Sequence, residues 1–187
     1  MFTSGILLAA GSSTRMGVDK LQLPYKGRLL IDCALAPLVE CRLIDEVIVV
    51  VRPDSSLLTD GPKCRIVVNP DHREGMGTSL RTGVQAASPA ADAFVVSLAD
   101  MPDLTAEIVT TLIEAFYRGG KQILVPVCDA RNGHPVVFAA ACRGDLLRLT
   151  GDLGARSLIA AHPELVTYLP VPHPAVIHDL DTPADIA

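Results

Sequence analysis

The sequence has no excess of positive charge, no paired cysteines and no long hydrophobic run. Its 187 residues include 16 Lys and Arg against 21 Asp and Glu, which gives a formal net charge of −5. This balance excludes a broad basic surface of the kind that binds nucleic acid or an anionic membrane. Any binding of phosphate groups must therefore depend on a few cations at one site, and we expect neither nucleic acid nor a membrane among the partners.

The cysteines are dispersed and odd in number, and no two of them form a C-x-x-C pair. They are Cys33, Cys41, Cys64, Cys128 and Cys142. This pattern indicates reduced thiols and not a disulfide framework or a zinc site. No apolar run approaches the roughly 20 residues of a membrane helix. Met1 leads directly into a predicted strand, which leaves no room for a signal peptide, so we expect a cytoplasmic protein.

Two common glycine fingerprints for nucleotides are also missing. Gly11 and Gly17 have five residues between them and Lys20 follows three residues later, which does not fit the P-loop pattern G-x-x-x-x-G-K-[ST]. The G-x-G-x-x-G pattern of dehydrogenase-like dinucleotide folds is not found in this loop either.

The most informative stretch of the chain nevertheless surrounds these glycines. Ile6–Ala10 is a short apolar run that predicts a buried first strand, and small residues from Gly11 to Gly17 follow it, with Arg15 among them and Lys20 just after. Small residues let backbone N–H groups approach a ligand closely. Together with a guanidinium and an ammonium group, these donors favour binding of phosphates. The alternative is an ordinary turn between a strand and a helix, carrying surface charges.

A second glycine turn lies between residues 69 and 83. Gly75 and Gly77 follow a predicted strand over Arg65–Val68, and Thr78 and Ser79 are expected to cap a helix from Leu80 to about Ala87. Such a turn places backbone donors at the carboxyl edge of a sheet, where ligands bind in open α/β folds. The turn is a plain helix cap or a second point of contact with a nucleotide.

Asp100 is the strongest candidate for a metal ligand. It follows a predicted buried strand over Ala93–Leu98, so its carboxylate is expected at the carboxyl edge of the sheet, facing bound phosphates. An aspartate just after a strand often only caps the next helix. Here Asp103 or Thr105 can cap the helix predicted over Thr105–Arg118, which leaves Asp100 available for Mg²⁺.

Strands and helices alternate through Val127, which predicts a three-layer α/β fold with a mostly parallel sheet. The strands predicted over Gln122–Val127 and Pro135–Phe138 are separated by too few residues for a crossover helix. They should therefore pair antiparallel and form a mixed edge of the sheet. We find no repeat or linker, so residues 1–187 are expected to form one domain.

Several blocks of sequence together resemble a known family. Residues 8–24, LAAGSSTRMGVDKLQLP, resemble the signature of the nucleotidyltransferases related to molybdenum cofactor guanylyl- and cytidylyltransferases. The cytidylyltransferase branch is resembled more narrowly by five further blocks, which are residues 74–83, 100–102, 132–135, 151–156 and 179–183.

This resemblance implies a Rossmann-like nucleotidyltransferase fold and a Mg²⁺-dependent reaction. CMP from CTP would be transferred to the terminal phosphate of the molybdenum cofactor (molybdopterin), with release of pyrophosphate. Arg15, Lys20 and Asp100 would be catalytic, and Asp100 would hold Mg²⁺ together with Asp181 or, as the second choice, Asp179. The residues implied to bind the nucleotide are Leu8, Ala9, Ala10, Gly11, Ser12, Ser13, Gly17, Gly77 and Ser79. Those implied to bind the acceptor are Asn132, His134 and Arg156.

Three alternatives stay open at this point. GTP is the other possible nucleotide, and CTP is favoured by resemblance because Ala10 stands where the guanylyl branch usually has glycine. The acceptor could be another phosphorylated compound, such as a sugar or polyol phosphate. A third possibility is a non-catalytic carrier that delivers the molybdenum cofactor to an oxidoreductase, and a molybdenum hydroxylase is the expected recipient of the product.

Overall fold

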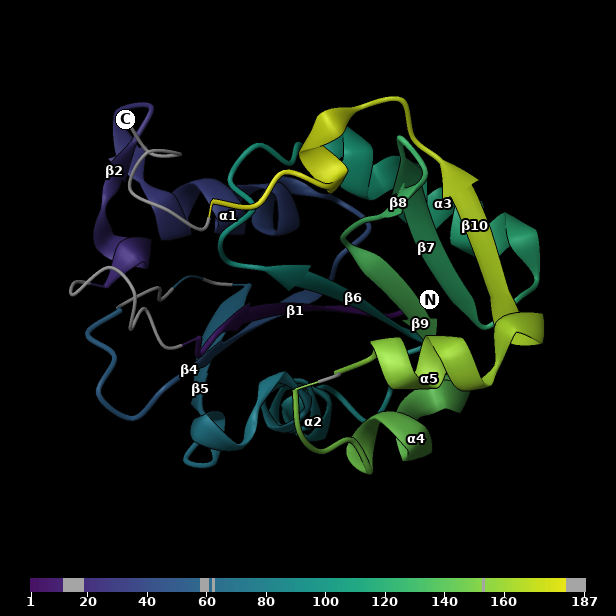
Figure 1. Ribbon diagram of the computed structural model, residues 1–187, viewed down its shortest axis with the longest axis horizontal. Helices are drawn as coiled ribbons and strands as arrows, with labels where there is room; N and C mark the ends of the chain where they lie inside the picture. The colour runs from purple at the N-terminus through teal and green to yellow at the C-terminus, as the bar shows by residue number, and fades with distance from the viewer. Residues whose placement is uncertain (12–18, 58–60, 62, 153, 181–187) are drawn as a thin grey trace.

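The computed structural model describes residues 1–11, 19–57, 61, 63–152 and 154–180. An eight-stranded sheet forms its centre, in the order β10-β7-β9-β6-β1-β4-β5, with β8 beside β7 (Figure 1). Its strands are β1 (Thr3–Ala9), β4 (Glu46–Val51), β5 (Cys64–Val68), β6 (Ala93–Leu98), β7 (Ile123–Cys128), β8 (Arg131–Asn132), β9 (Val136–Ala139) and β10 (Val166–Pro170). A separate hairpin pairs β2 (Pro24–Tyr25) with β3 (Arg28–Leu29).

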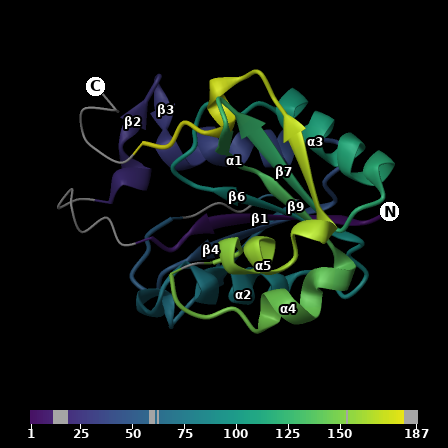
Figure 2. The ribbon, with the colours of Figure 1, turned by 45° about the vertical axis from the view of Figure 1, so that its right-hand side comes forward.

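Helices cover both faces of this sheet. α1 (Leu30–Glu40) and α3 (Ala106–Gly119) lie on one face, and α2 (Met76–Ala86), α4 (Arg143–Leu147) and α5 (Arg156–Ala161) lie on the other (Figures 1 and 2). Short 3-10 helices complete the description: η1 (Lys20–Gln22), η2 (His72–Glu74), η3 (Ala140–Cys142), η4 (Pro163–Leu165) and η5 (Pro174–Val176). The predicted three-layer α/β fold is confirmed. Within the described residues, no helix has the length and apolar character needed to span a bilayer.

The neighbouring strands β1 and β4 are mostly apolar, and helices cover both of their faces. β4 is buried from Val47 to Val51 and pairs in parallel with β1, with Leu7 opposite Val49. Side chains of a strand alternate between the two faces, so Leu7 joins the hydrophobic cluster under α1 and α3, whereas Ile6 joins the cluster under α2. A strand buried on both faces is expected to be a continuous apolar run and not an alternating one.

The antiparallel pairing of β7 and β9 is also confirmed, but β9 does not lie at an edge. It pairs antiparallel with both β6 and β7 and so lies inside the sheet. The physical reason is burial: Val136, Val137 and Phe138 are all buried, and a buried strand needs partners for the backbone groups on both of its sides. β10, which is parallel to β7, forms that edge instead.

The helix expected to begin after Thr78 and Ser79 begins earlier, so the predicted cap is wrong. α2 starts at Met76, and its N-cap residue is Gly75, with φ of +113°. The Thr78 hydroxyl donates to the Gly75 carbonyl oxygen at 2.9 Å, and the Asn69 amide donates to the Ser79 hydroxyl at 3.0 Å. Both side chains therefore form hydrogen bonds at the first turn as residues of the helix itself, and neither is its N-cap. The predicted cap of α3 is confirmed, since Thr105 Oγ1 accepts from the Ile108 N–H.

Gly83 lets α2 pack closely on β1. A Cβ at this position would lie 2.5 Å from Ile6 Cγ2 and 3.1 Å from Val50 Cγ2. We predict that Gly83→Ala lowers the free energy of unfolding by about 1–3 kcal/mol, the usual cost of overpacking a core. Denaturant unfolding measures the change.

Gly144→Ala is the matched control, because this exposed glycine is also in a helix but has only Arg148 Nη1 near its Cβ position, at 3.7 Å. Its stability should be unchanged or raised by up to about 1 kcal/mol. Equal effects of the two substitutions would contradict the packing argument.

Candidate active site

Lys20, Asp100 and Leu180 meet at the carboxyl edge of the sheet. Lys20 Nζ lies 3.0 Å from Asp100 Oδ2 and donates to the Leu180 carbonyl oxygen at 2.9 Å. The Leu180 N–H donates to the Asp100 carbonyl oxygen, also at 2.9 Å. Lys20 and Asp100 are 80 positions apart in the sequence, and Leu180 is 160 positions from Lys20. The fold brings Lys20 and Asp100 together because β1 and β6 are parallel neighbours. Two predicted catalytic residues are thus in direct contact.

Asp100 keeps one oxygen available for a ligand. Its side chain is 24% exposed, and Oδ2 is engaged by Lys20. Oδ1 is buried and has no protein partner, which in a folded protein calls for an explanation such as a bound ion or water. Mg²⁺ typically binds through one or two carboxylates plus water and substrate phosphates, so a single open carboxylate oxygen fits that metal. No cluster of three or more His, Cys, Asp or Glu able to hold a metal occurs within the described ranges.

His134 is next to this site and is uncharged at neutral pH. Burial lowers the pKa of its imidazole below the ordinary value, and this outweighs the contact with the Val96 backbone and the charge of Asp100, which both raise it. Arg156 adds to the lowering of the pKa, whereas Asp179 opposes it. The His134 Nδ1 atom is buried without a protein partner. Asp100, Arg156 and Asp179 thus lie near enough to His134 for their charges to affect the pKa of its imidazole.

The Gly133–His134 pair is held by the segment that follows β10. The His134 N–H donates to the Val176 carbonyl oxygen at 2.7 Å, and a Cβ on Gly133 would overlap that same oxygen. The glycine is therefore required by the close approach of η5. Asn132, in contrast, is exposed on β8.

The blocks at residues 74–83 and 151–156 also meet each other. Gly77 donates its N–H to the Gly151 carbonyl oxygen at 2.8 Å, and a Cβ on Gly77 would lie 2.9 Å from that oxygen. A Cβ on Gly75 would overlap Asp152 and Gly151. Packing against the Gly151 loop thus accounts for both glycines of the turn. Ser79 is 5% exposed, and its hydroxyl accepts from the Asn69 amide.

Part of the predicted nucleotide loop lies outside the described residues, namely Ser12, Ser13, Arg15 and Gly17, and so does the predicted metal ligand Asp181. Of the described part, Ala9 and Ala10 are buried at 2% and 3% exposure, and Gly11 is exposed. The Ala10 methyl group packs in the hydrophobic cluster under α2. It is therefore a core contact in this structure, and the argument for CTP from Ala10 gains no support from the fold.

Asp103 forms a polar network that the sequence did not reveal. Its carboxylate accepts from Tyr25 Oη at 3.0 Å and from Lys26 Nζ at 2.6 Å, and it lies 2.8 Å from His178 Nδ1. Burial opposes ionisation of Asp103, but these hydrogen bonds outweigh it and lower the pKa of the carboxyl group. The network ties the β2–β3 hairpin and the segment before Leu180 to the chain that follows Asp100.

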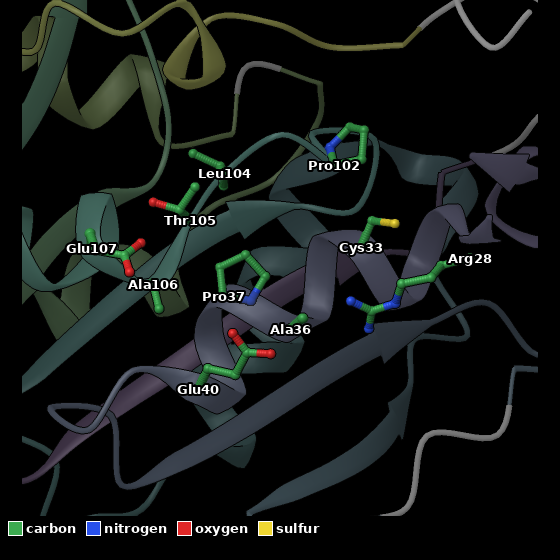
Figure 3. A pocket seen from close by; sticks show the side chains of 10 residues that line it. All are labelled: Arg28, Cys33, Ala36, Pro37, Glu40, Pro102, Leu104, Thr105, Ala106 and Glu107. Carbon is green, nitrogen blue, oxygen red and sulfur yellow. The ribbon is translucent and has the colours of Figure 1, made fainter. Parts of the chain in front are cut away.

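Two cavities border the chain between Met101 and Ala106 without including the Lys20–Asp100 pair. One, of about 240 Å³, lies between α1 and the start of α3, with Arg28, Cys33 and Glu40 on the side of α1 and the hairpin (Figure 3). The other, of about 350 Å³, is lined by Lys26, Asp103 and His178 among others. Neither contains a residue predicted to bind the nucleotide.

Comparison with known proteins places these features in a family. The model of the family described as the MobA-like NTP transferase domain matches residues 5–166. The nicotine blue oxidoreductase of Paenarthrobacter nicotinovorans is 32% identical over 193 residues, covering 96% of this chain and 92% of that protein.

Some relatives carry names that refer to the molybdenum cofactor. The molybdenum cofactor cytidylyltransferase of Escherichia coli is 24% identical over 96% of this chain and 91% of its own length. A probable molybdenum cofactor guanylyltransferase of Thermococcus gammatolerans is 36% identical over 65% of this chain and 61% of its own length.

Solved structures of similar fold cover nearly the whole chain. The crystal structure of Rv0371c from Mycobacterium tuberculosis superimposes with a TM-score of 0.83 at 26% identity, covering 99% of this chain and 96% of that one. The same protein has been solved in complex with manganese, with a TM-score of 0.79 at 25% identity and the same coverage. A nucleotidyl transferase from Methanothermobacter superimposes with a TM-score of 0.81 at 21% identity, covering 98% and 94% of the two chains, and so shares the fold.

The lowered pKa of His134 predicts a stability loss in mild acid. The unfolded chain takes up a proton on this histidine near pH 6.5, whereas the folded chain resists it, so the free energy of unfolding should fall as the pH drops below that value. His134→Gln removes the titrating group. Urea unfolding between about pH 5 and pH 8 should therefore show a shallower decline for the variant than for the wild type. Parallel curves would mean that His134 titrates alike in both states.

Proposed function

Because the chain belongs to the family of MobA-like NTP transferase domains, we propose that it transfers CMP from CTP to the terminal phosphate of the molybdenum cofactor and releases pyrophosphate. Membership of the family supports a nucleotidyltransferase, and the choice of nucleotide and acceptor is our proposal. It is supported by the blocks of sequence that resemble the cytidylyltransferase branch and by the cytidylyltransferase relative in Escherichia coli.

The observation that carries the proposal is the contact between Lys20 and Asp100 at the carboxyl edge of β1 and β6. Displacement at an α-phosphate depends on positioning and charge neutralisation more than on covalent chemistry. In our proposal the Lys20 ammonium group, with Arg15, neutralises charge that develops on the α-phosphoryl group and the departing pyrophosphate. The attacking phosphate is already anionic at neutral pH, so no general base is needed.

We propose Mg²⁺ as the cofactor, held by Asp100 together with Asp181. A divalent cation, when bound, would neutralise charge on the triphosphate. Asp100 supports this role because Oδ1 is buried and has no protein partner. A manganese complex is known for the similar Rv0371c, which favours a divalent metal without distinguishing the two ions.

The remaining assignments follow the same edge of the sheet. Residues Leu8 to Gly11 and the chain to Gly17 would bind the triphosphate, and Ser79 and Gly77 at the start of α2 would contact the base. The Gly77 N–H is already bonded to Gly151 and the Ser79 hydroxyl oxygen accepts from Asn69, so in our proposal a polar contact with the base uses the Ser79 O–H as a donor. Arg156 and His134, with Asn132, would bind the acceptor phosphate. The exposed guanidinium of Arg156 at the start of α5 suits this role.

The names of two relatives favour other functions. The relative from Thermococcus gammatolerans favours GTP as the alternative nucleotide. The nicotine blue oxidoreductase, at 32% identity over 96% of this chain, makes an oxidoreductase the second candidate function, because fold alone does not decide chemistry. Another phosphorylated acceptor, a carrier role and delivery to a molybdenum hydroxylase in the cytoplasm also stay predictions, as does the organisation of residues 1–187 as one domain.

Pyrophosphate release tests the proposal. The purified chain is mixed with molybdenum cofactor and Mg²⁺, and CTP, GTP, ATP and UTP are compared separately. We expect release with CTP, no release without the cofactor acceptor, and loss of release on chelation of the metal with EDTA, which added Mg²⁺ restores.

Release with GTP alone would overturn the choice of CTP and keep the reaction class. If no nucleotide yields pyrophosphate while the chain oxidises a reduced nicotinamide or flavin in a parallel assay, the second candidate replaces the first. Binding of the cofactor without either reaction would indicate a carrier.

A further inference from the structure

Arg52 connects two points of the chain that border the predicted nucleotide loop. It follows β4 directly, and β4 is the neighbour of β1 in the sheet, so its guanidinium lies beside the chain that leaves β1. Arg52 Nη1 donates to the Gly11 carbonyl oxygen at 3.3 Å, and Nη2 pairs with Asp19 Oδ2 at 2.9 Å. Nε pairs with Asp54 Oδ1 at 2.9 Å. One side chain thus holds Gly11 and Asp19 in place.

Asp19 in turn determines how η1 begins. Its Oδ1 accepts from the Leu21 N–H at 3.2 Å, and its carbonyl oxygen accepts from the Gln22 N–H at 3.0 Å. Lys20 is the first residue of η1. The orientation of Asp19 therefore sets the position of the Lys20 backbone, from which the Lys20 side chain extends. The contacts run from Arg52 through Asp19 to Lys20 and on to Asp100.

Burial distinguishes the two ion pairs of this guanidinium. The Arg52 and Asp19 side chains are 15% and 12% exposed, whereas Asp54 is 77% exposed. Exposed ion pairs contribute little because water and salt screen them. Removing one partner of a largely buried pair leaves an uncompensated charge and costs much more. The pair with Asp54 is therefore dispensable, and the pair with Asp19 is not.

We propose that Arg52 is a positioning residue for Lys20, acting through Asp19 and the Gly11 carbonyl group. The planar fork of a guanidinium can serve both acceptors at once, which a lysine ammonium group on a flexible stem does less well. The kinetic part of this inference rests on the proposed function, whereas the placement of Lys20 does not. Nothing in the sequence marked Arg52, because it lies outside every block that resembles the family.

The first experiment reads the placement of Lys20 directly and needs no activity. The rate at which an amine-reactive ester acylates Lys20 is measured by peptide mass spectrometry in the wild type, Arg52→Ala, Arg52→Lys and Asp54→Asn. Lys20 is 16% exposed and bonded to Asp100 and Leu180, so we expect Arg52→Ala to raise its acylation rate several-fold. Arg52→Lys should raise it less, and Asp54→Asn should match the wild type.

The second experiment measures kcat and KM for pyrophosphate release. Arg52→Ala should lower kcat/KM for the nucleotide by about 10²-fold, the scale expected when a reacting group is misplaced by about 1 Å. Asp19→Asn retains a good N-cap residue and removes the charge, so its loss should be smaller. The double variant should be no slower than Arg52→Ala, because both changes interrupt one chain of contacts.

Thermal unfolding of each variant separates misplacement from loss of folding. If Arg52→Ala does not fold, Arg52→Lys carries the acylation experiment and Asp19→Asn carries the kinetic one. An unchanged acylation rate of Lys20 in the folded Arg52 variants overturns the inference, whatever the activity. A wild type that releases no pyrophosphate counts against the proposed function alone. Multiplying losses in the double variant would show that Arg52 and Asp19 act independently, which also overturns it.

Discussion

The ion pair between Lys20 and Asp100 is the contact on which the rest of the candidate site depends. It joins η1 to the end of β6. The Leu180 carbonyl oxygen accepts from Lys20 and the Leu180 N–H donates to the Asp100 carbonyl oxygen, so three distant segments are fixed by one local set of hydrogen bonds. The side chains are 16% and 24% exposed, which strengthens their attraction relative to a pair in water. An arriving triphosphate and metal would meet a cation and an anion already in place, and positioning is the main demand of this chemistry.

The glycines of the resembling blocks have a structural reason of their own. Gly75 and Gly77 are required where α2 meets the Gly151 loop, and Gly133 is required where η5 approaches. These close contacts join the block around residue 75 to the block around residue 151, and the block around residue 134 to η5. The glycines shape the site by allowing backbone segments to approach, in addition to any contact with a ligand.

The sequence predicted much of this arrangement, and its failures have physical causes. The strands over residues 46–51 and 93–98 were predictable because continuous apolar runs have few other solutions in an α/β fold. The start of α2 was not predictable. The amide of buried Asn69 donates to the Thr78 and Ser79 hydroxyls, which were expected to cap the helix. The position of β9 depends on which strands it pairs with. Its apolar pattern would be the same at the edge of the sheet as inside the sheet. The hydrogen bonds of Leu180 to Lys20 and Asp100 use its backbone atoms and leave no pattern in the sequence, and the role of Arg52 depends on tertiary contacts.

The central claim is that Lys20 and Asp100 act as one unit at the reacting phosphate. A double-mutant cycle on kcat/KM for pyrophosphate release, with Lys20→Ala, Asp100→Asn and the double variant, tests it most directly. Each single change should lower kcat/KM by about 10²–10³-fold, and the double variant should be no slower than the slower single one, because residues that act as a unit are not additive. Losses that multiply in the double variant would contradict the account.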